Sequence, residues 1–252
     1  MPATTRSAHV RGVQMTRAIV VVPTYNEAEN IPLLVPQILA QDESLEVLIV
    51  DDASPDGTGE IADTLAASES RVHVLHRPGK QGLGPAYRAG LAQALELGAD
   101  FVIQMDADFS HPPTSLPQFL EEIENHDVVL GSRYLNGITV VNWPIERILI
   151  SWFGNVYARR ISGLPISDTT GGFRCMRRSV LEKIDFGRVR SNGYAFQIEM
   201  NYRFVKQGAR LKEVPFFFVD RTRGTSKLNF RIGLEALWMV WWLRIADALG
   251  RL

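Results

Sequence analysis

The chain has 252 residues, a length that fits one large domain or two small ones. Hydrophobic residues make up 46% of it and charged residues 22%, a composition typical of a globular protein that buries a substantial core. Because 27 basic residues nearly balance 28 acidic ones, the net charge is -1, and no whole-molecule attraction to nucleic acid is expected. The single cysteine, Cys175, excludes an internal disulfide and a cysteine-based metal cluster.

The first 16 residues form a polar segment without the apolar core of a secretory signal. We expect this segment to be a disordered lead-in. The lack of a secretory signal in it favours a cytoplasmic protein.

Strands and helices alternate along most of the remaining chain. β-Branched residues over 17–23 predict a strand buried on both faces, and apolar residues at helical spacing over 26–40 predict a helix after it. Alternation of this kind predicts right-handed βαβ units, and therefore an α/β fold with a parallel sheet covered by helices. In chain order the pattern continues with a strand at 46–51, a helix at 57–67, a strand at 71–75, a helix at 84–97, a strand at 101–105, a helix at 114–124 and a strand at 128–131.

Polar residues gather just after the predicted strands, where ligands bind in open α/β sheets. Each group by itself also suits a helix cap or a turn, which naturally follow strands in βαβ units. Together at one edge of a sheet they indicate a common site. The groups occupy residues 23–27, 51–58, 77–84, 106–108 and 132–134.

The most informative group is Asp106-Ala107-Asp108, which ends the predicted strand over 101–105. Two carboxylates separated by one small residue offer oxygen ligands to a hard divalent cation such as Mg²⁺ or Mn²⁺. The open positions of such a cation accept diphosphate oxygens, and its charge offsets that of a departing nucleoside diphosphate. By itself the pattern also suits an ordinary strand-terminal turn. The glycine patterns of dinucleotide folds and of P-loops are both absent, so those two classes are disfavoured.

In combination these motifs resemble those of family 2 glycosyltransferases, which have the GT-A fold, a mostly parallel Rossmann-like sheet flanked by helices. Two later motifs, at 168–174 and 221–227, make the sequence similar to the polyprenyl-phosphate (dolichyl-phosphate) mannose synthases within that family. The resemblance spans about residues 17–235. Its earlier part rests on Val22-Pro23-Thr24-Tyr25-Asn26-Glu27, on residues 50–58, on Asp106-Ala107-Asp108 and on Gly131-Ser132-Arg133-Tyr134.

The resemblance also implies roles for individual residues. Asp106 and Asp108 would hold Mg²⁺ or Mn²⁺, and Ser110 stands where related enzymes often carry Gln, so a third side-chain ligand is left open. A nucleotide sugar would be bound by Pro23, Tyr25, Glu27, Asp52, Lys80, Gly82, Asp106, Ala107, Asp108 and Arg133. The acceptor phosphate would be bound by Arg147, Ser151, Asp168, Arg221 and Lys227. The catalytic set would be Asp106, Asp108, Arg133 and Arg221.

The reaction that the resemblance implies is transfer of a mannosyl group from GDP-mannose to a polyprenyl, dolichyl-like phosphate by a metal-assisted inverting displacement. A phosphate monoester has a second pKa of about 6, so it is ionised near neutral pH and needs little help from a general base. We accordingly interpret His111 as structural or supporting, and Glu199 as a solvent-facing helix residue. Two alternatives are a polyprenyl-phosphate glucosyltransferase that uses UDP-glucose and a non-catalytic nucleotide-sugar-binding membrane scaffold.

Two segments suit a membrane surface. Residues 229–252 carry Trp238, Trp241 and Trp242, and their apolar run is far shorter than the roughly 20 residues of a spanning helix. We therefore expect an amphipathic helix in the headgroup region, following a catalytic domain over 17–228. Residues 140–161 are a second candidate, and both segments could instead pack on the sheet. The expected location is peripheral, on the cytoplasmic face of a membrane, with a separate membrane-anchoring subunit left open as a partner.

Overall fold

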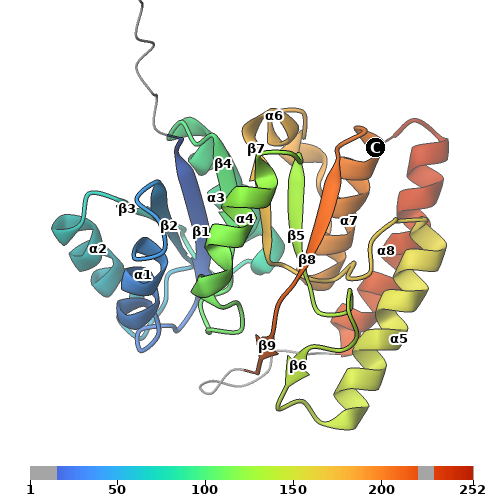
Figure 1. Ribbon diagram of the computed structural model, residues 1–252, viewed down its shortest axis with the longest axis horizontal. Helices are drawn as coiled ribbons and strands as arrows, with labels where there is room; N and C mark the ends of the chain where they lie inside the picture. Colours follow the sequence, from blue (N-terminus) through green and yellow to red (C-terminus); the bar gives the residue numbers. More distant parts are fainter. Residues whose placement is uncertain (1–15, 221–229, 252) are drawn as a thin grey trace, which may run out of the picture.

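A central sheet of seven strands organises the structure, a computed structural model that describes residues 16–220 and 230–251, with the backbone alone described for 230–236. The strands lie in the order β3-β2-β1-β4-β7-β5-β8 (Figure 1). The mostly parallel α/β sheet that the sequence predicts is thereby confirmed. The strands are β1 (Ala18–Thr24), β2 (Leu45–Asp51), β3 (Val72–His76), β4 (Phe101–Gln104), β5 (Val128–Ser132), β7 (Arg174–Arg177) and β8 (Leu211–Pro215).

One strand, β7, runs against the others. It pairs antiparallel with β4 on one side and with β5 on the other, whereas the other pairs of this sheet are parallel. Its sequence, Arg174-Cys175-Met176-Arg177, lacks the alternation and the β-branched residues that identify a strand. Sequence patterns therefore do not predict β7, which is positioned by pairing with strands far away in the chain.

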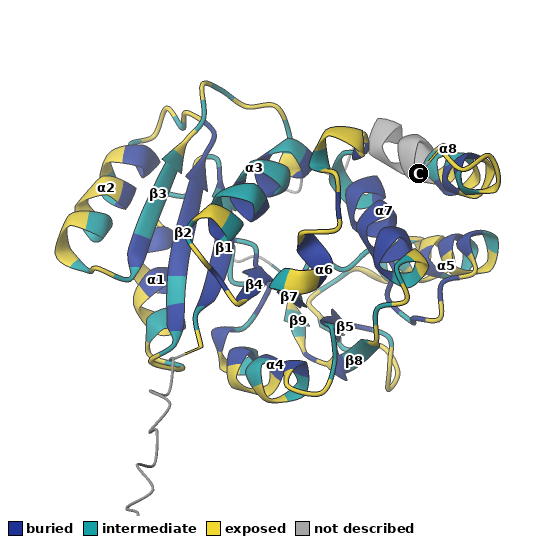
Figure 2. Cartoon of the chain, turned by 90° about the horizontal axis from the view of Figure 1, so that it is seen from above, coloured by how far each residue is buried: buried dark blue, intermediate teal, exposed yellow. Residues whose placement is uncertain are grey.

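Helices cover both faces of the sheet. Along β1, Val20 belongs to an apolar cluster shared with α1, α2 and α4. Its neighbours Ile19 and Val21 belong to a second cluster, shared with α3, α6 and α7. Figure 2 shows α3 and α7 on the opposite side of the sheet from α1 and α4. Strand β1 is thus buried on both faces, as its β-branched sequence predicts. The helices are α1 (Ile31–Leu39), α2 (Thr58–Ser68), α3 (Leu83–Glu96), α4 (Leu116–Ile123), α6 (Arg178–Leu181) and α7 (Gly193–Lys206).

Two long helices, α5 (Ile145–Ser162) and α8 (Phe230–Ala248), pack side by side at one end of the sheet (Figure 1). The indole N–H of Trp241 donates to the Tyr157 hydroxyl at 2.9 Å, which joins the two helices directly. No helix in the described part of the chain has both the length and the apolar character needed to cross a membrane. The short elements that complete the structure are β6 (Val140–Val141), which pairs in parallel with β9 (Phe218–Val219), and the 3-10 turns η1 (Pro113–Ser115) and η2 (Phe186–Arg188).

The predicted element boundaries agree with the structure except at residues 140–161 and at the first helix. That helix is predicted over 26–40 but begins at Ile31, because Asn26 adopts a left-handed conformation with φ 60° and the chain turns before Pro32 opens the helix. The segment predicted from residue 140 begins with β6 at Val140–Val141, and its helix, α5, starts only at Ile145, after Pro144. The remaining predicted strands and helices start within two residues of their observed starts. The carboxyl ends of β1, β2, β4 and β5 therefore lie where the sequence analysis expects polar groups.

Candidate active site

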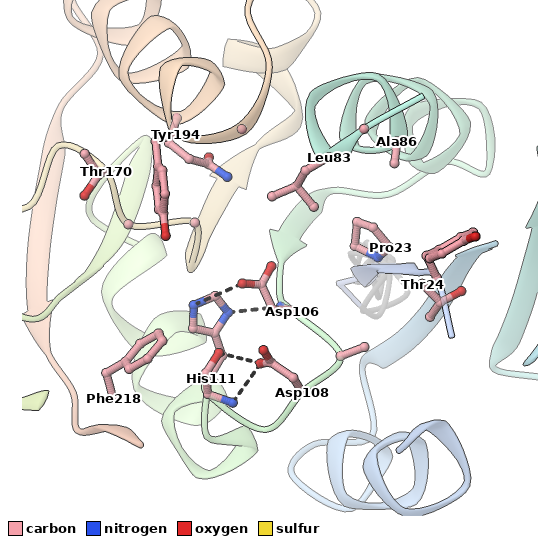
Figure 3. A pocket seen from close by; sticks show the side chains of 18 of the residues that line it. Pro23, Thr24, Leu83, Ala86, Asp106, Asp108, His111, Thr170, Tyr194 and Phe218 are labelled. Atoms are coloured by element: carbon pink, nitrogen blue, oxygen red, sulfur yellow. Dashed lines mark hydrogen bonds and ion pairs between the residues drawn. The ribbon is translucent and has the colours of Figure 1, made fainter. Parts of the chain in front are cut away.

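A pocket lies at the edge of the sheet where β1, β2, β4 and β5 end (Figure 3). Its volume is about 470 Å³, within the range of small-ligand sites. Every residue predicted for the nucleotide sugar lines this pocket, and so does Arg147 from the predicted acceptor set. The predicted residues at the wall are Pro23, Tyr25, Glu27, Asp52, Lys80, Gly82, Asp106, Ala107, Asp108, Arg133 and Arg147.

The turns after β1 and β2 are fixed to each other by short polar side chains. The Asp51 carboxylate accepts from the Thr24 hydroxyl and from the Ser54 N–H, each at 3.0 Å. The backbone N–H of Glu27 donates to the Thr58 hydroxyl at 3.0 Å. The polar residues that follow β2 therefore hold the turn after β1, and this turn presents part of the pocket wall.

Asp52 and Lys80 belong to a turn and a loop that are tied together. The Arg77 guanidinium forms an ion pair with Asp52, whose side chain is 6% exposed. The ammonium group of Lys80 lies 3.9 Å from the centre of the Tyr25 ring, a distance at which the ring face attracts a cation. A flat ring with a cation beside it suits a nucleotide, which offers a planar base and charged phosphates.

The loop before α3 passes so close to α7 that it requires glycine. Gly82 has φ +103°, and a Cβ there would lie 2.2 Å from Nδ2 of Asn192. A Cβ on Gly84 would lie 2.7 Å from the carbonyl oxygen of Ser191. Asn192 in turn accepts hydrogen bonds from the N–H groups of Gly84, at 2.9 Å, and of Gly193, at 2.8 Å. Asn192 therefore joins this loop to the beginning of α7.

Two carboxylates follow β4 and line the pocket, as the sequence predicts (Figure 3). The Asp106 side chain is 34% exposed, and its Oδ1 accepts from the hydroxyl of buried Tyr87 at 2.8 Å. Burial and the nearby Asp106 charge raise the pKa of Tyr87 well above its ordinary value, so this hydroxyl stays protonated. Asp108 accepts from the hydroxyl of Ser110 at 2.6 Å. The Ser110 proton is therefore directed at Asp108, which gives Ser110 a supporting contact to that carboxylate.

The two aspartates fit a divalent cation of the Mg²⁺ or Mn²⁺ type. Such cations take oxygen ligands, and Mg²⁺ in particular is often held by one or two carboxylates together with substrate phosphates. Among residues 16–220 and 230–251, no group of three or more His, Cys, Asp or Glu side chains could hold a metal ion. A cation held by Asp106 and Asp108 would have further positions open to the oxygens of a diphosphate.

His111 holds the turn that carries Asp106. Its Nδ1 accepts from the Asp106 N–H at 3.0 Å, so the ring proton is on Nε2, which lies 4.0 Å from Oδ2 of Asp106. The ring is buried and stacks on Phe173, with the ring centres 4.8 Å apart. Burial lowers the pKa of His111, which keeps the ring neutral near pH 7. These contacts agree with the supporting role that the sequence analysis gives to His111.

Arg133 and Asp168 form a buried ion pair beside the end of β5. The guanidinium donates to Asp168 from Nε at 2.6 Å and from Nη2 at 2.8 Å, and the Arg133 backbone N–H donates at 3.1 Å. Although burial acts to raise it, the Arg133 charge and these hydrogen bonds hold the pKa of Asp168 below its ordinary value. Arg133 lines the pocket, whereas Asp168 lies behind it. Asp168 thus holds Arg133 in place, and its predicted membership of the acceptor-phosphate set stays a prediction.

Arg147, near the start of α5, lines the pocket beside Trp143. Its guanidinium lies 4.0 Å from the centre of the Trp143 ring, and Nη1 donates to Asp220 at 2.7 Å. The Nε of Arg147 and the indole Nε1 of Trp143 are buried, and no described residue accepts a hydrogen bond from either. Buried donors of this kind suit an anionic ligand. Ser151 is not part of the wall, and its hydroxyl accepts from that of Tyr134 at 2.8 Å.

Comparison with known proteins assigns the chain to a family. The model for glycosyl transferase family 2 matches residues 19–185. This chain belongs to glycosyl transferase family 2. It is 47% identical over 221 residues to the undecaprenyl-phosphate mannosyltransferase of Micrococcus luteus, covering 88% of this chain and 91% of that protein. It is 45% identical over 241 residues to the polyprenol monophosphomannose synthase of Mycolicibacterium smegmatis, covering 94% of this chain and 90% of that protein. The family that the motifs predict is confirmed.

Solved structures of lower identity share the fold of this family 2 glycosyltransferase. Glucosyl-3-phosphoglycerate synthase from Mycobacterium tuberculosis, in complex with Mn²⁺, uridine-diphosphate-glucose and phosphoglyceric acid, gives a TM-score of 0.67 at 17% identity, over 90% of this chain and 79% of that one. The same enzyme with Mn²⁺, uridine-diphosphate and glucosyl-3-phosphoglycerate gives a TM-score of 0.61 at 20% identity, over 94% of this chain and 80% of that one. These likenesses confirm the predicted GT-A fold.

The pocket wall of this family 2 glycosyltransferase also contains residues to which the sequence analysis gives no individual role. Figure 3 shows Thr170 and Tyr194 across the pocket from Leu83 and Ala86. A polar residue such as Asn192 directly before a helix is a detectable capping signal, whereas the apolar wall residues carry no signal of their own. These additional residues include Thr24, Leu83, Ala86, Trp143, Thr170, Asn192, Tyr194, Gln197 and Phe218.

The interpretation of Glu199 as a solvent-facing residue is wrong. Its side chain is fully buried in α7, accepts from the Ser191 N–H at 3.1 Å and pairs with Arg203 at 2.7 Å. A charged residue is tolerated there because its partner lies one helical turn away and is itself mostly buried. Arg221 and Lys227, predicted for the acceptor phosphate, lie outside the residues that the structure describes, so their roles stay predictions.

Proposed function

We propose that this glycosyltransferase transfers a mannosyl group from GDP-mannose to a polyprenyl, dolichyl-like phosphate, giving a polyprenyl-phosphate mannose. The observation that carries the proposal is the presence, at one pocket, of a carboxylate pair and of arginine side chains. The carboxylates suit a metal-bound diphosphate, and the arginines suit an attacking phosphate. Two relatives at 47% and 45% identity, named for undecaprenyl-phosphate mannosyl transfer and polyprenol monophosphomannose synthesis, support this sugar and this class of lipid.

On the donor side, Asp106 and Asp108 would hold Mg²⁺ or Mn²⁺. Such a cation offsets the negative charge that develops on the departing nucleoside diphosphate. A protein of similar fold was solved with Mn²⁺ and uridine-diphosphate-glucose, which supports the use of a divalent cation. The remaining parts of the nucleotide sugar would be bound by Pro23, Tyr25, Glu27, Asp52, Lys80, Gly82 and Ala107, all of which line the pocket.

On the acceptor side, the lipid phosphate would attack the anomeric carbon in a single displacement that inverts its configuration. The phosphate is already ionised near neutral pH, so the pocket needs no general base and catalysis rests on positioning and charge. Arg133 and Arg147 would bind the phosphate. The buried N–H groups of Arg147 and Trp143, for which no described residue is an acceptor, support an anion at this place.

Further residues are proposed to complete the acceptor side. Arg221 and Lys227 would contact the lipid phosphate, with Arg221 counted among the catalytic residues. Asp168 would act through Arg133, with which it forms the buried ion pair. Ser151 would act through its hydrogen bond with the Tyr134 hydroxyl, at 2.8 Å.

The acceptor lipid is proposed to be met at a membrane surface beside α5 and α8. Large apolar side chains on both helices are exposed, including Ile150 at 71% and Phe153 at 60% on α5, and Trp238 at 65% and Trp241 at 49% on α8. Tryptophan favours the headgroup region because its ring is amphipathic. Trp242, in contrast, packs against the core. Exposed aromatic residues on two adjacent helices support an interfacial surface.

The domain organisation follows from the same proposal. Residues 17–228 would form the catalytic domain and 229–252 an amphipathic helix at the membrane interface. Peripheral binding to the cytoplasmic face, and a separate membrane-anchoring subunit, belong to the proposal as well.

The proposal is tested by giving the purified protein labelled GDP-mannose or UDP-glucose with vesicles that contain a polyprenyl phosphate. We expect label to enter the lipid from GDP-mannose alone, and polyprenol without a phosphate is the matched control. Transfer from UDP-glucose but not from GDP-mannose would favour the glucosyltransferase alternative. Nucleotide-sugar binding without transfer to any lipid would favour the non-catalytic scaffold.

A further inference from the structure

A buried hydroxyl group reaches one of the two pocket aspartates from the far side of the pocket wall. Tyr87 belongs to α3, is fully buried, and donates from its hydroxyl to Oδ1 of Asp106 at 2.8 Å. Buried tyrosine hydroxyls usually find a hydrogen-bond partner. Here the partner is a carboxylate that also faces the pocket, with 34% of its side chain exposed. The Oδ1 atom of Asp106 is therefore held by a buried hydroxyl group that does not itself line the pocket.

The two aspartates are held in different ways. Asp106 is fixed by Tyr87, 19 residues away, and by His111, whose Nδ1 accepts from its backbone N–H at 3.0 Å. Asp108 accepts hydrogen bonds from the N–H of Ser110, at 3.1 Å, and from its hydroxyl, at 2.6 Å. The contacts to Ser110 are local to the turn, whereas the contact to Tyr87 connects the turn after β4 with a separate helix.

The position of Tyr87 is itself determined by packing. Its ring stacks against that of Phe196 in α7, with centres 6.0 Å apart and planes 4° from parallel. The first turns of the same helix, α3, present Leu83 and Ala86 to the pocket, directly after Gly82 (Figure 3). One helix thus carries part of the proposed nucleotide wall and also the hydroxyl that holds Asp106.

We propose that Tyr87 is a positioning residue for the divalent cation: it fixes Oδ1 of Asp106 and thereby orients this carboxylate toward a cation in the pocket. The inference rests on the metal assignment of the proposed function. Hydrogen-bond partners of metal-binding carboxylates commonly affect metal affinity by 10–100-fold, because they set the orientation of the ligand. Tyr87 also makes the geometry of Asp106 depend on where α3 lies.

The test compares two substitutions that each remove one tyrosine hydroxyl bonded to an aspartate. Tyr87→Phe keeps the ring and its packing and loses only the bond to Asp106. Tyr202→Phe is the matched control, because the Tyr202 hydroxyl bonds to Asp247 at 3.0 Å, outside the pocket wall. Mn²⁺ binding is measured by calorimetry and by the electron paramagnetic resonance of free Mn²⁺, with and without GDP, and GDP binding is measured separately in EDTA.

We expect Tyr87→Phe to weaken Mn²⁺ binding about tenfold, and Tyr202→Phe to leave it at the wild-type value. GDP binding in EDTA should be the same in all three proteins. Wild-type Mn²⁺ affinity in Tyr87→Phe would overturn the inference and leave the metal assignment intact. An equal loss of GDP binding in EDTA would show a general structural effect and would also overturn it. If the wild-type protein binds no Mn²⁺ with or without GDP, the inference and the metal assignment fail together, whereas mannosyl transfer is judged by its own assay.

Discussion

The two sides of the pocket are built in different ways. Beside β1 and β2, the wall is held by hydrogen bonds among short side chains at the strand ends, such as those that Asp51 accepts from Thr24 and Ser54. Beside β5, it depends on the buried ion pair between Arg133 and Asp168, which are 35 residues apart. Removing one hydrogen bond to a charged group usually costs about 1.5–3 kcal/mol, whereas removing one partner of a buried ion pair costs about 3–5 kcal/mol. The β5 side should therefore tolerate substitution less well.

The surfaces next to these two sides differ as well. On α1, beside β1, Leu33 is the large hydrophobic residue that is exposed, at 52%. On α5, exposed large hydrophobic residues follow one another along the helix, with Ile150 and Phe153 among the most exposed. Scattered exposed apolar residues are ordinary, but a group of them marks a contact surface. The comparison predicts that one side of the molecule faces water and the other a lipid surface.

The largest effect is expected where the two sides meet, at the aspartates after β4. Asp106→Ala or Asp108→Ala leaves the charge of the departing diphosphate uncompensated, so turnover should fall by about 10³-fold. The melting temperature should change little in Asp108→Ala, whereas Asp106→Ala also removes the acceptor of the buried Tyr87 hydroxyl and should lower it by a few degrees. Mannosyl transfer and thermal unfolding measure the two effects. Excess EDTA should stop the wild-type enzyme and Mg²⁺ or Mn²⁺ should restore it; full activity in EDTA would contradict the metal assignment.

The next largest effect concerns the stability of the β5 side. Asp168→Asn leaves Arg133 buried without its counter-charge and should lower the free energy of unfolding by about 3–5 kcal/mol. The pKa of Asp168 is depressed in the folded state, so the contribution of this carboxylate is fully present above its unfolded pKa of about 3.9 and is lost as the pH falls through the folded value. Urea unfolding at a series of pH values should show the difference between wild type and variant shrinking below about pH 4. A difference that stays constant down to about pH 2.5 would contradict the assignment of the effect to this carboxylate.

A smaller effect, on membrane binding, tests the difference between the exposed surfaces of α5 and α1. Ile150→Ser should lower partitioning into phospholipid vesicles by about tenfold, because burying such a side chain contributes about 1.5–3 kcal/mol. Leu33→Ser is the matched control on α1 and should leave partitioning unchanged. Sedimentation with vesicles measures both. Equal losses in the two variants, or none in either, would remove the distinction between the water-facing and lipid-facing sides.

The smallest effect separates backbone strain from crowding in the loop before α3. Gly82 and Gly137 both have φ +103°, but a Cβ on Gly82 would meet Asn192 whereas one on Gly137 has nothing within 4 Å. Either change to Ala should cost about 1–2 kcal/mol of stability for the left-handed backbone. Gly82→Ala alone should also weaken GDP-mannose binding several-fold, as measured by calorimetry. Similar donor affinities in the two variants would indicate that the contact with Asn192 does not shape the donor site.

The difference between the two sides of the pocket also explains which parts of the site could be predicted from the sequence. The residues proposed for the donor belong to short motifs directly after regular strands, so Tyr25, Asp52 and Asp106 could be assigned to one pocket from their positions in the chain. The ion pair of Arg133 with Asp168 depends on how segments far apart in the chain meet, and so does the hydrogen bond of Tyr87 with Asp106. Local patterns carry no information about such contacts.

Glu199 and β7 show two further limits of sequence patterns. An acidic residue in a helix is usually exposed. Glu199 is buried instead, because Ser191 donates a hydrogen bond to its carboxylate and Arg203 forms an ion pair with it inside the protein. β7 departs from the usual strand pattern because its two arginines lie at the ends of a strand buried between two others.

The reversed strand β7 acts as a spacer of fixed width. Neighbouring strands lie about 4.8 Å apart, so β7 separates β4 from β5 by roughly 10 Å. Asp106 follows β4 and Arg133 follows β5; under the proposed function, the hexose would lie between a diphosphate beside Asp106 and a phosphate beside Arg133. Because β7 runs backwards, the chain enters it at the pocket edge, where Gly171 and Gly172, just before the strand, line the pocket. A sheet in which β4 and β5 were direct neighbours would bring the ends of these two strands to about 4.8 Å from each other.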